Sequence, residues 1–123
     1  MQVRKTRQRA AIRSLLESTP HPLTVDEVKR GVADSLGGVG IATVYRSLNA
    51  LREEGWLRSV EVPGEPVRYE RSHKEHHHHF ACSSCERLFD VSGCVDVTVM
   101  VPKNFRVDDH AVTLYGVCAE CSA

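Results

Sequence analysis

Two short cysteine pairs constrain this chain more than any other feature of its sequence. They are Cys82-x-x-Cys85 and Cys118-x-x-Cys121. Four thiolates in two such pairs can close a tetrahedral zinc site, and in a reducing compartment paired cysteines are interpreted as metal ligands before disulfides. We therefore predict a structural zinc held by two pairs that the fold must bring together across 32 intervening residues.

The fifth cysteine, Cys94, is left over. It is either a small buried apolar side chain or an oxidisable or ligating thiol.

Four consecutive histidines lie just before the first cysteine pair. On a strand, successive side chains point to opposite faces, so His77 and His79 share one face. Two imidazoles at this spacing need one or two carboxylates to form a nitrogen/oxygen site for iron, manganese or zinc. Glu70 and Asp90 are suitable residues, and we predict that all four form one metal site.

The opposite face of the same run carries His76 and His78. His110 and Asp96 could join them in a further metal site. The alternative for the whole run is an exposed strand with adventitious affinity for metals. A purification tag is disfavoured because the run is internal and flanked by ordinary sequence.

At 123 residues the chain is long enough for one domain or for two small ones, each with a limited hydrophobic core. Modules of this size commonly depend on a metal or on a partner subunit. The N-terminus does not resemble a signal peptide, and no apolar run approaches the roughly 20 residues needed to span a bilayer. We therefore expect a cytoplasmic protein with no membrane contact.

The formal net charge is zero, which by itself argues against nucleic acid as a partner. The distribution is uneven, because residues 1–70 carry 11 basic and 9 acidic side chains, while residues 71–123 carry 5 and 7. Residues 1–13 contain five basic side chains and no acidic one. This end is either a solvated helix face or an arm that contacts DNA.

The first part of the chain predicts a helix-turn-helix core followed by a hairpin. Thr6 can cap the first helix, Thr24 and Glu27 form a capping box for the second, and Gly55 ends the third. The predicted helices cover 6–18, 25–36 and 42–54, with a glycine-rich turn at 37–40, and the predicted strands cover 57–62 and 67–70. Three helices and a two-stranded wing make a winged helix.

The remainder is predicted to consist mainly of strands, at 80–83, 88–92 and 107–117, with a further strand-like alternation of valines at 95–101. The composition shifts at residues 71–75, so we place the boundary between domains of residues 1–71 and 72–123. The predicted fold class is α+β, with an N-terminal winged helix-turn-helix domain and a small, β-rich, zinc-binding second domain.

In a helix-turn-helix protein the N-terminal residues of the last core helix reach base edges in the major groove. Ala42 and the ring of Tyr45 could contact thymine methyl groups, and Arg46 could pair with guanine or a phosphate. The basic N-terminal arm could reach the backbone or a narrow minor groove. The alternative is a surface for protein contacts. The residues that we expect on double-stranded operator DNA are Arg4, Lys5, Ala42, Thr43, Tyr45 and Arg46.

Several motifs together resemble the ferric uptake regulator (Fur) family over nearly the whole chain. They are Thr6-x-x-Arg9, Leu23-Thr24-x-x-Glu27, the run 41–48, Arg68-Tyr69-Glu70, the histidine-to-Cys85 segment, and His110 followed by Leu114-Tyr115-Gly116-x-Cys118-x-x-Cys121. Members are dimeric winged-helix repressors with a structural four-cysteine zinc and a sensing metal site.

The resemblance implies a homodimer whose second domain mediates dimerisation. It places the structural zinc on the four cysteines and the sensing metal on Glu70, His77, His79 and Asp90. It also implies that Tyr45 and Arg46 contact bases and that Arg4 lies at the minor groove.

The chain departs from the family pattern at three places. The family's sensing site usually takes a histidine just before the second helix; Pro22 matches that position here, and His21, one residue earlier, is a further candidate ligand. The long dimerisation helix between the cysteine pairs is missing, and that segment is several residues shorter. Residues 71–75 hold no cysteine of the kind that zinc-sensing members often carry, which favours iron, manganese or peroxide sensing.

We therefore predict a metal-dependent repressor in which an ion held by Glu70 and by the second domain couples the two domains. One alternative is a constitutive winged-helix DNA-binding protein with structural zinc only. A zinc hydrolase or deaminase, suggested by His73-x-Glu75, is disfavoured because residue 81 is not proline and four thiolates leave no open position for water.

Overall fold

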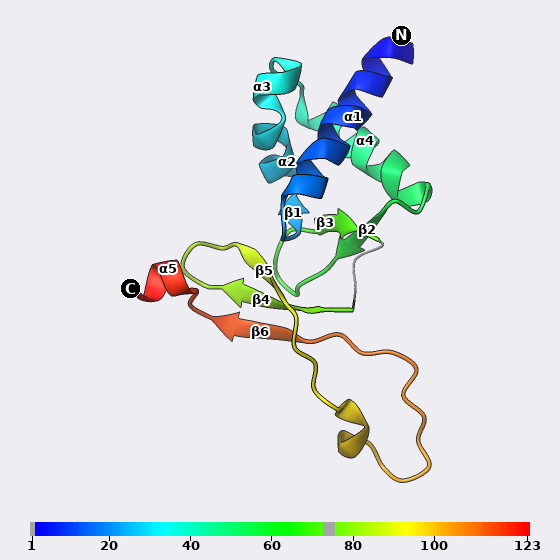
Figure 1. Cartoon of the computed structure of the whole chain (residues 1–123), viewed down its shortest axis with the longest axis vertical. Coiled ribbons are helices and arrows are strands. Elements are labelled where there is room, and N and C mark those ends of the chain that lie inside the picture. Colours follow the sequence, from blue (N-terminus) through cyan, green and yellow to red (C-terminus); the bar gives the residue numbers. More distant parts are fainter. Residues whose placement is uncertain (1, 73–75) are drawn as a thin grey trace. The chain divides into compact units, whose positions relative to one another are not determined.

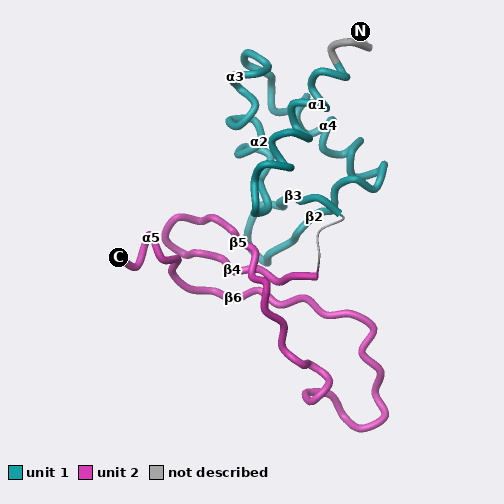
Figure 2. The backbone as a smooth tube through the Cα atoms, in the orientation of Figure 1, with its two compact units in different colours: residues 1–74 teal, residues 75–123 magenta. Residues whose placement is uncertain are grey.

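The computed structural model describes residues 2–72 and 76–123, with side chains from residue 5 onward. The chain divides into two compact units, residues 1–74 and 75–123 (Figure 2). The division falls close to our domain boundary after residue 71, which stays a prediction. His73 and Glu75 lie outside the described residues.

The first unit has a helical core followed by a small antiparallel sheet (Figure 1). Its three strands are ordered β1-β3-β2. In chain order the elements are α1 (Gln2–Ser18), β1 (Leu23–Thr24), α2 (Val25–Gly31), α3 (Ala33–Leu36), α4 (Ile41–Glu53), β2 (Leu57–Val60) and β3 (Arg68–Arg71).

Helix α1 begins earlier than the sequence predicted. Thr6 lies inside the helix rather than at its start, so its assignment as the cap was wrong. Its buried face carries Ile12 and Leu16, which lie one turn apart and are both almost fully buried.

The second predicted helix is interrupted at Val32, which separates α2 from α3. Its start is as predicted, because the Thr24 hydroxyl accepts from the backbone N–H of Glu27 and the Glu27 carboxylate accepts from that of Thr24. Gly37 then adopts a left-handed conformation, with φ of 63°, and ends α3.

Helix α4 and the wing follow the sequence prediction closely. Gly55, with φ of 84°, takes the chain out of α4 and into β2. Gly64, with φ of 80°, lies in the turn of the antiparallel β2–β3 hairpin. Strand β1 was not predicted. It is only two residues long, and it pairs with β3 on the side opposite β2, with Leu23 opposite Tyr69.

The first unit is built around a single core to which every one of its elements except α3 contributes a buried side chain. The core residues are Ile12, Leu16, Leu23, Val28, Val32, Val44, Leu48, Leu51, Leu57 and Tyr69. Because α4 contributes Val44, Leu48 and Leu51 to this core, its opposite face is left for solvent or a partner.

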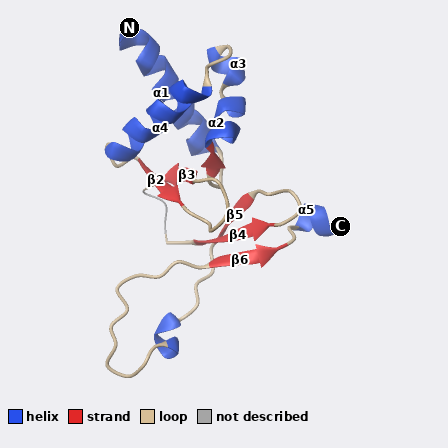
Figure 3. Ribbon diagram, turned by 180° about the vertical axis from the view of Figure 1, so that it is seen from behind, coloured by secondary structure: helices blue, strands red, loops and turns tan. Residues whose placement is uncertain are grey.

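The second unit is built on a three-stranded sheet ordered β5-β4-β6 (Figure 3). Strand β4 pairs antiparallel with β5 and parallel with β6. Its elements are β4 (His78–Cys82), β5 (Leu88–Val91), the 3-10 helix η1 (Val97–Met100), β6 (Thr113–Gly116) and α5 (Ala119–Ser122). A long connection that includes η1 leads from β5 past β4 to β6, which lies on the other side of β4.

Two strand predictions for the second unit were wrong. The valine alternation at 95–101 does not form a strand, because Asp96 caps η1 there by accepting from the backbone N–H of Thr98. The last strand covers only Thr113–Gly116 rather than 107–117. Alternating valines have no neighbouring strand to pair with in this connection, so the pattern alone does not make a strand.

Large apolar side chains are exposed along the second half of the second unit. Val99 is 79% exposed, Met100 76% and Phe105 67%. Tyr115 on β6 is 63% exposed. None of these belongs to a membrane-spanning helix, since no helix in the described part of the chain is long and apolar enough to cross a bilayer.

Replacing Thr24 by Ala should lower the free energy of unfolding of the first unit by about 1 kcal/mol, because the capping hydroxyl is lost. Thr24→Ser keeps a hydroxyl and should stay close to the parent protein. The single tryptophan, Trp56, packs against the core of the first unit, so its fluorescence during urea unfolding reports the change. Equal destabilisation by both variants would contradict this role of the cap.

Candidate metal centres and recognition helix

The four paired cysteines come together at one end of the second sheet. Cys82 ends β4 and Cys85 lies in the turn that follows. The parallel pairing of β4 with β6 sets Cys82 opposite Gly116, so the chain leaving β6 delivers Cys118 and Cys121 to the same place. Their four sulfur atoms all lie within 4.8 Å of one another.

The sulfur geometry suits a tetrahedral ion. With metal–sulfur bonds of about 2.3 Å, adjacent sulfurs of a tetrahedral site are about 3.8 Å apart. Sγ of Cys85 and Sγ of Cys118 are 3.9 Å apart. The thiol group therefore fits zinc without rearrangement at this pair, while zinc binding itself stays a prediction.

Backbone amides make Cys82 an acidic thiol. The N–H groups of Cys85 and Cys118 each donate to its sulfur at 3.4 Å, and they lower the pKa of Cys82 to about 6. The guanidinium of Arg87 donates to Cys85 at 3.3 Å and lowers the pKa of that thiol as well.

The pKa of Cys121 is shifted in the opposite direction. The neighbouring sulfur of Cys118, followed by burial, raises its pKa to about 12. Crowded thiolates repel one another, so a cation is needed before all four can be deprotonated together.

A second group of ligands lies on strands β4 and β5. Nε2 of His77 is 3.8 Å and Nε2 of His79 is 3.7 Å from Oδ1 of Asp90. The two imidazole centroids are 4.8 Å apart, as expected for residues i and i+2 on one face. His79 and Asp90 are also direct cross-strand neighbours. Three of the four residues predicted for the nitrogen/oxygen site therefore converge within the second unit.

The fourth residue of that prediction, Glu70, belongs to the first unit. It lies on β3, where Nη2 of Arg58 on the neighbouring strand donates to Oε2 at 3.0 Å. His21 also belongs to the first unit, between α1 and β1. Their roles as ligands stay predictions.

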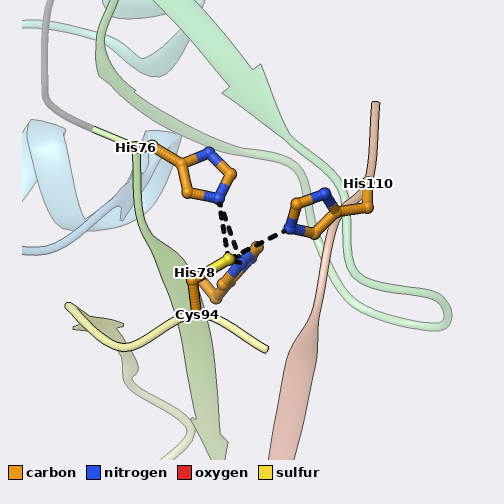
Figure 4. A group of neighbouring side chains, drawn as sticks. All are labelled: His76, His78, Cys94 and His110. Carbon is orange, nitrogen blue, oxygen red and sulfur yellow. Dashed lines mark hydrogen bonds between the residues drawn. The ribbon is translucent and has the colours of Figure 1, made fainter. Parts of the chain in front are cut away.

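The other face of the histidine run carries a third group (Figure 4). The structure brings His76, His78 and His110 together, as predicted, and adds Cys94 to them. The sequence left Cys94 as either a small buried apolar side chain or an oxidisable or ligating thiol, and the buried alternative was wrong, because Cys94 is exposed. The signal that could have identified it is its place in the chain, shortly after a strand that pairs with the histidine-bearing strand.

The structure does not bring Asp96 to this group. Its carboxylate accepts from the backbone N–H of Thr98 at 3.1 Å and from the Thr98 hydroxyl. These hydrogen bonds lower the pKa of Asp96 and occupy it as the cap of η1.

His78 is the buried member of the third group. The backbone N–H of Val112 donates to its Nδ1 at 3.3 Å, which directs Nε2 towards the other members. Burial lowers the pKa of His78, and the neighbouring His76 and His110 lower it further. The neutral imidazole is the form that binds metals.

The predicted DNA-reading residues occupy the start of α4. Tyr45 is half exposed, Ala42 and Arg46 are exposed, and Thr43 is partly buried. Nη2 of Arg46 donates to the Thr43 hydroxyl at 3.2 Å, so the guanidinium lies along the helix surface.

The basic N-terminal helix is partly neutralised. Arg9 and Arg13 both bind Glu54 at the end of α4, at 3.0 and 3.5 Å. Lys5 is exposed. The side chain of Arg4 lies outside the described part of the chain.

The first unit is a winged helix, and the second is a β unit with four clustered thiols and two histidine-rich groups. This combination is typical of metal-binding transcription regulators. The model of the Ferric uptake regulator family matches residues 1–115. The chain belongs to this family. The family consists of transcription regulators rather than enzymes, so the predictions of a regulator and against an enzyme are both confirmed.

The relatives include regulators of two kinds. The chain is 33% identical over 108 residues to the ferric uptake regulation protein of Campylobacter upsaliensis, covering 85% of this chain and 67% of that protein. It is 31% identical over 125 residues to the peroxide operon regulator of Bacillus subtilis, covering 98% of this chain and 85% of that protein.

Among solved structures, the chain resembles the ferric uptake regulator Fur of Helicobacter pylori, a protein with three functional metal binding sites. The TM-score is 0.77 at 25% sequence identity, covering 94% of this chain and 80% of the other. The predicted α+β fold class is thereby confirmed.

Replacing Cys121 by Ser should abolish one equivalent of tightly held zinc, because three thiolates no longer close the site. Metal analysis after chelation, with zinc-edge X-ray absorption, checks this: the parent protein should keep one sulfur-only zinc. Ser122→Ala changes the next residue of α5 and should keep that zinc. Retention of sulfur-only zinc in the Cys121 variant would contradict the assignment.

Proposed function

We propose that this protein is a metal-responsive transcriptional repressor that binds operator DNA as a homodimer. The observation that carries the proposal is the separation of two ligand groups within one small sheet. The four thiols suit a permanent zinc, whereas His77, His79 and Asp90 offer nitrogen and oxygen donors of the kind that exchange iron, manganese or zinc.

The proposed DNA contact is made by α4. Its core side chains fix the helix to the first unit, and its exposed N-terminal residues are those that a helix-turn-helix protein places in the major groove. Lys5 and Arg4 would add contacts to the backbone or the minor groove. A regulator of this kind acts on chromosomal DNA, so we propose the cytoplasm as its location.

The proposed sensing site consists of His77, His79 and Asp90, completed by Glu70. Glu70 precedes the histidine run in sequence, and it carries a carboxylate on the last strand of the winged helix. A metal held by residues of both units favours one arrangement of those units over others, which is how occupancy can alter DNA affinity.

The homodimer proposal is supported by the exposed apolar side chains of the second unit. Val99, Met100, Phe105 and Tyr115 are each more than 60% exposed. Large exposed apolar side chains on so small a unit are typical of surfaces that a partner covers. A second copy of this chain is the partner expected for a regulator that reads two half-sites.

The constitutive alternative differs in one respect only. A winged-helix protein with structural zinc alone would bind DNA equally well with or without an exchangeable metal. The convergence of two imidazoles and one carboxylate in the second unit favours the metal-responsive version.

Replacing His77 and His79 together by Ala should remove the metal dependence of DNA binding. Operator sequences are first enriched from random duplexes with the manganese-loaded protein, and affinity is then measured by mobility shift with and without Mn(II). Asp90→Asn should weaken the response in the same direction, because it removes an anionic ligand. Asp108→Asn is the matched carboxylate control and should behave like the parent protein.

Equal affinity of the parent protein with and without Fe(II), Mn(II) or Zn(II) would instead support the constitutive alternative.

Replacing Arg46 by Ala should weaken binding to the enriched operator by about 1–3 kcal/mol if the guanidinium reads a base. Sequence preference should relax at one position of each half-site. If Arg46 contacts a phosphate, the loss should be similar on all sequences and the salt slope should fall by about 1. Lys103→Ala, an exposed cation of the second unit, is the control. Unchanged affinity of the Arg46 variant would argue against α4 as the DNA-contacting helix.

A further inference from the structure

A guanidinium lies beside the thiol group and contacts both cysteine pairs. Arg87, two residues after Cys85, donates from Nε to Sγ of that cysteine at 3.3 Å. The same side chain donates from Nη2 to Oε2 of Glu120. Glu120 lies between Cys118 and Cys121, the two members of the second pair. One side chain therefore links the two halves of the thiol group, from residues that are 33 positions apart in the chain.

An aromatic ring holds this guanidinium from a further direction. Cζ of Arg87 lies 5.1 Å from the centroid of the Phe89 ring on β5, within the range of cation–π attraction. The guanidinium thus has three partners, which are a sulfur, a carboxylate and a ring. A planar group with three partners is fixed in orientation, so its Nε–H is directed at the sulfur of Cys85.

The ion pair with Glu120 does not by itself explain the placement of Arg87. The side chain of Glu120 is 77% exposed, and exposed ion pairs contribute little to stability. The contact with sulfur has a larger consequence. Four thiolates around one zinc ion leave two negative charges in excess, and a cation that donates to a ligand sulfur offsets part of that charge through a charge-assisted hydrogen bond.

The four sulfurs differ in the donors that they receive. Sγ of Cys82 accepts from the backbone N–H groups of Cys85 and Cys118, each at 3.4 Å. Sγ of Cys85 accepts from Arg87. Sγ of Cys118 contacts another sulfur at 3.9 Å, and within the described residues no N–H donates to Sγ of Cys118 or Cys121. A hydrogen bond withdraws electron density from a thiolate and makes it a weaker nucleophile, so two of these sulfurs are protected and two are not.

We propose that Arg87 is a positioning residue of the thiol site, whose guanidinium stabilises the zinc-bound thiolate of Cys85 and protects it from electrophiles. Glu120 orients the guanidinium from the opposite cysteine pair. Backbone amides protect Cys82, whereas the protection of Cys85 depends on this side chain. The inference rests on the assignment of zinc to the four thiols and is independent of metal-responsive DNA binding.

The parent protein tests the ranking of the sulfurs without any substitution. The full chain is kept reduced, anaerobic and zinc-loaded, and is exposed to iodoacetamide so briefly that at most one thiol in each molecule reacts. Mass spectrometry of the singly labelled protein locates the label, and labels on the exposed Cys94 are set aside. We expect Cys118 and Cys121 to be labelled before Cys85. Labelling of Cys85 as fast as theirs, or faster, would overturn the proposal.

Arg87→Gln removes the positive charge and the Nε donor but leaves the backbone amides at Cys82 in place. Labelling of Cys85 relative to Cys82 should rise at least about threefold, because a charge-assisted hydrogen bond is lost. Arg87→Lys keeps the charge without the planar guanidinium and should give a smaller rise. Arg106→Gln removes a guanidinium that is paired with Asp108, so it is the matched control and should behave like the parent protein.

A purely structural role of Arg87 would have a different result. Loosening of the whole thiol group would raise the labelling of all four paired cysteines together. Such a uniform rise in the Arg87→Gln variant, or an unchanged ratio of Cys85 to Cys82, would contradict the proposal.

Zinc retention measures the same contribution without alkylation. In competition with a chelator, the zinc dissociation constant of Arg87→Gln should rise about tenfold. This is the lower end of the roughly 10–100-fold that loss of a metal ligand's hydrogen-bond partner costs, because the Arg87 side chain is 34% exposed. An unchanged constant would refute the role of Arg87. A parent protein without sulfur-only zinc would refute the zinc assignment and this inference together, whereas metal-independent DNA binding would refute the proposed function alone.

Discussion

The parallel pairing of β4 with β6 is the interaction on which the second unit depends. It sets Cys82 opposite Gly116, which places the two cysteine pairs at one end of the sheet. At the other end it sets His79 opposite Thr113, which brings the segment with His110 next to the histidine run. Strands separated by a long connection gain little from local contacts, and a metal on the four thiols would stabilise this pairing. Zinc in a thiol site contributes folding free energy on the order of 10 kcal/mol, enough to hold a sheet with so small a core.

Strand β4 also separates two kinds of side-chain group by the alternation of its side chains. His77 and His79 face Asp90, a hard anionic ligand, whereas His76 and His78 face Cys94, a soft one. Four identical residues in a row therefore belong to two different groups of side chains. Asp90 and Cys94, rather than the histidines, distinguish the two faces chemically.

The winged helix and the thiol group were largely predictable, because local signals define them. The Thr24–Glu27 capping box, the helical spacing of Val44, Leu48 and Leu51, and Gly55 each act within a few residues. The spacing of two residues within each cysteine pair is itself typical of metal ligands, so the thiol group could be predicted from the sequence. The valines at 95–101 misled the prediction because alternation indicates a strand only where another strand is available for pairing. Asp96 was assigned to the wrong role for a related reason, since a cap on η1 satisfies its carboxylate locally.

The sequence by itself determined which donor atoms are present and which of them share a face of a strand. Successive side chains of a strand point to opposite faces, and this alternation is a local property of the backbone. Only the tertiary structure decided that Cys94, and not Asp96, completes the face of His76 and His78. That choice depends on how the connection from β5 returns past β4 to β6. The course of a long connection is set by packing and by the ligands at its ends, neither of which can be deduced from residue spacing.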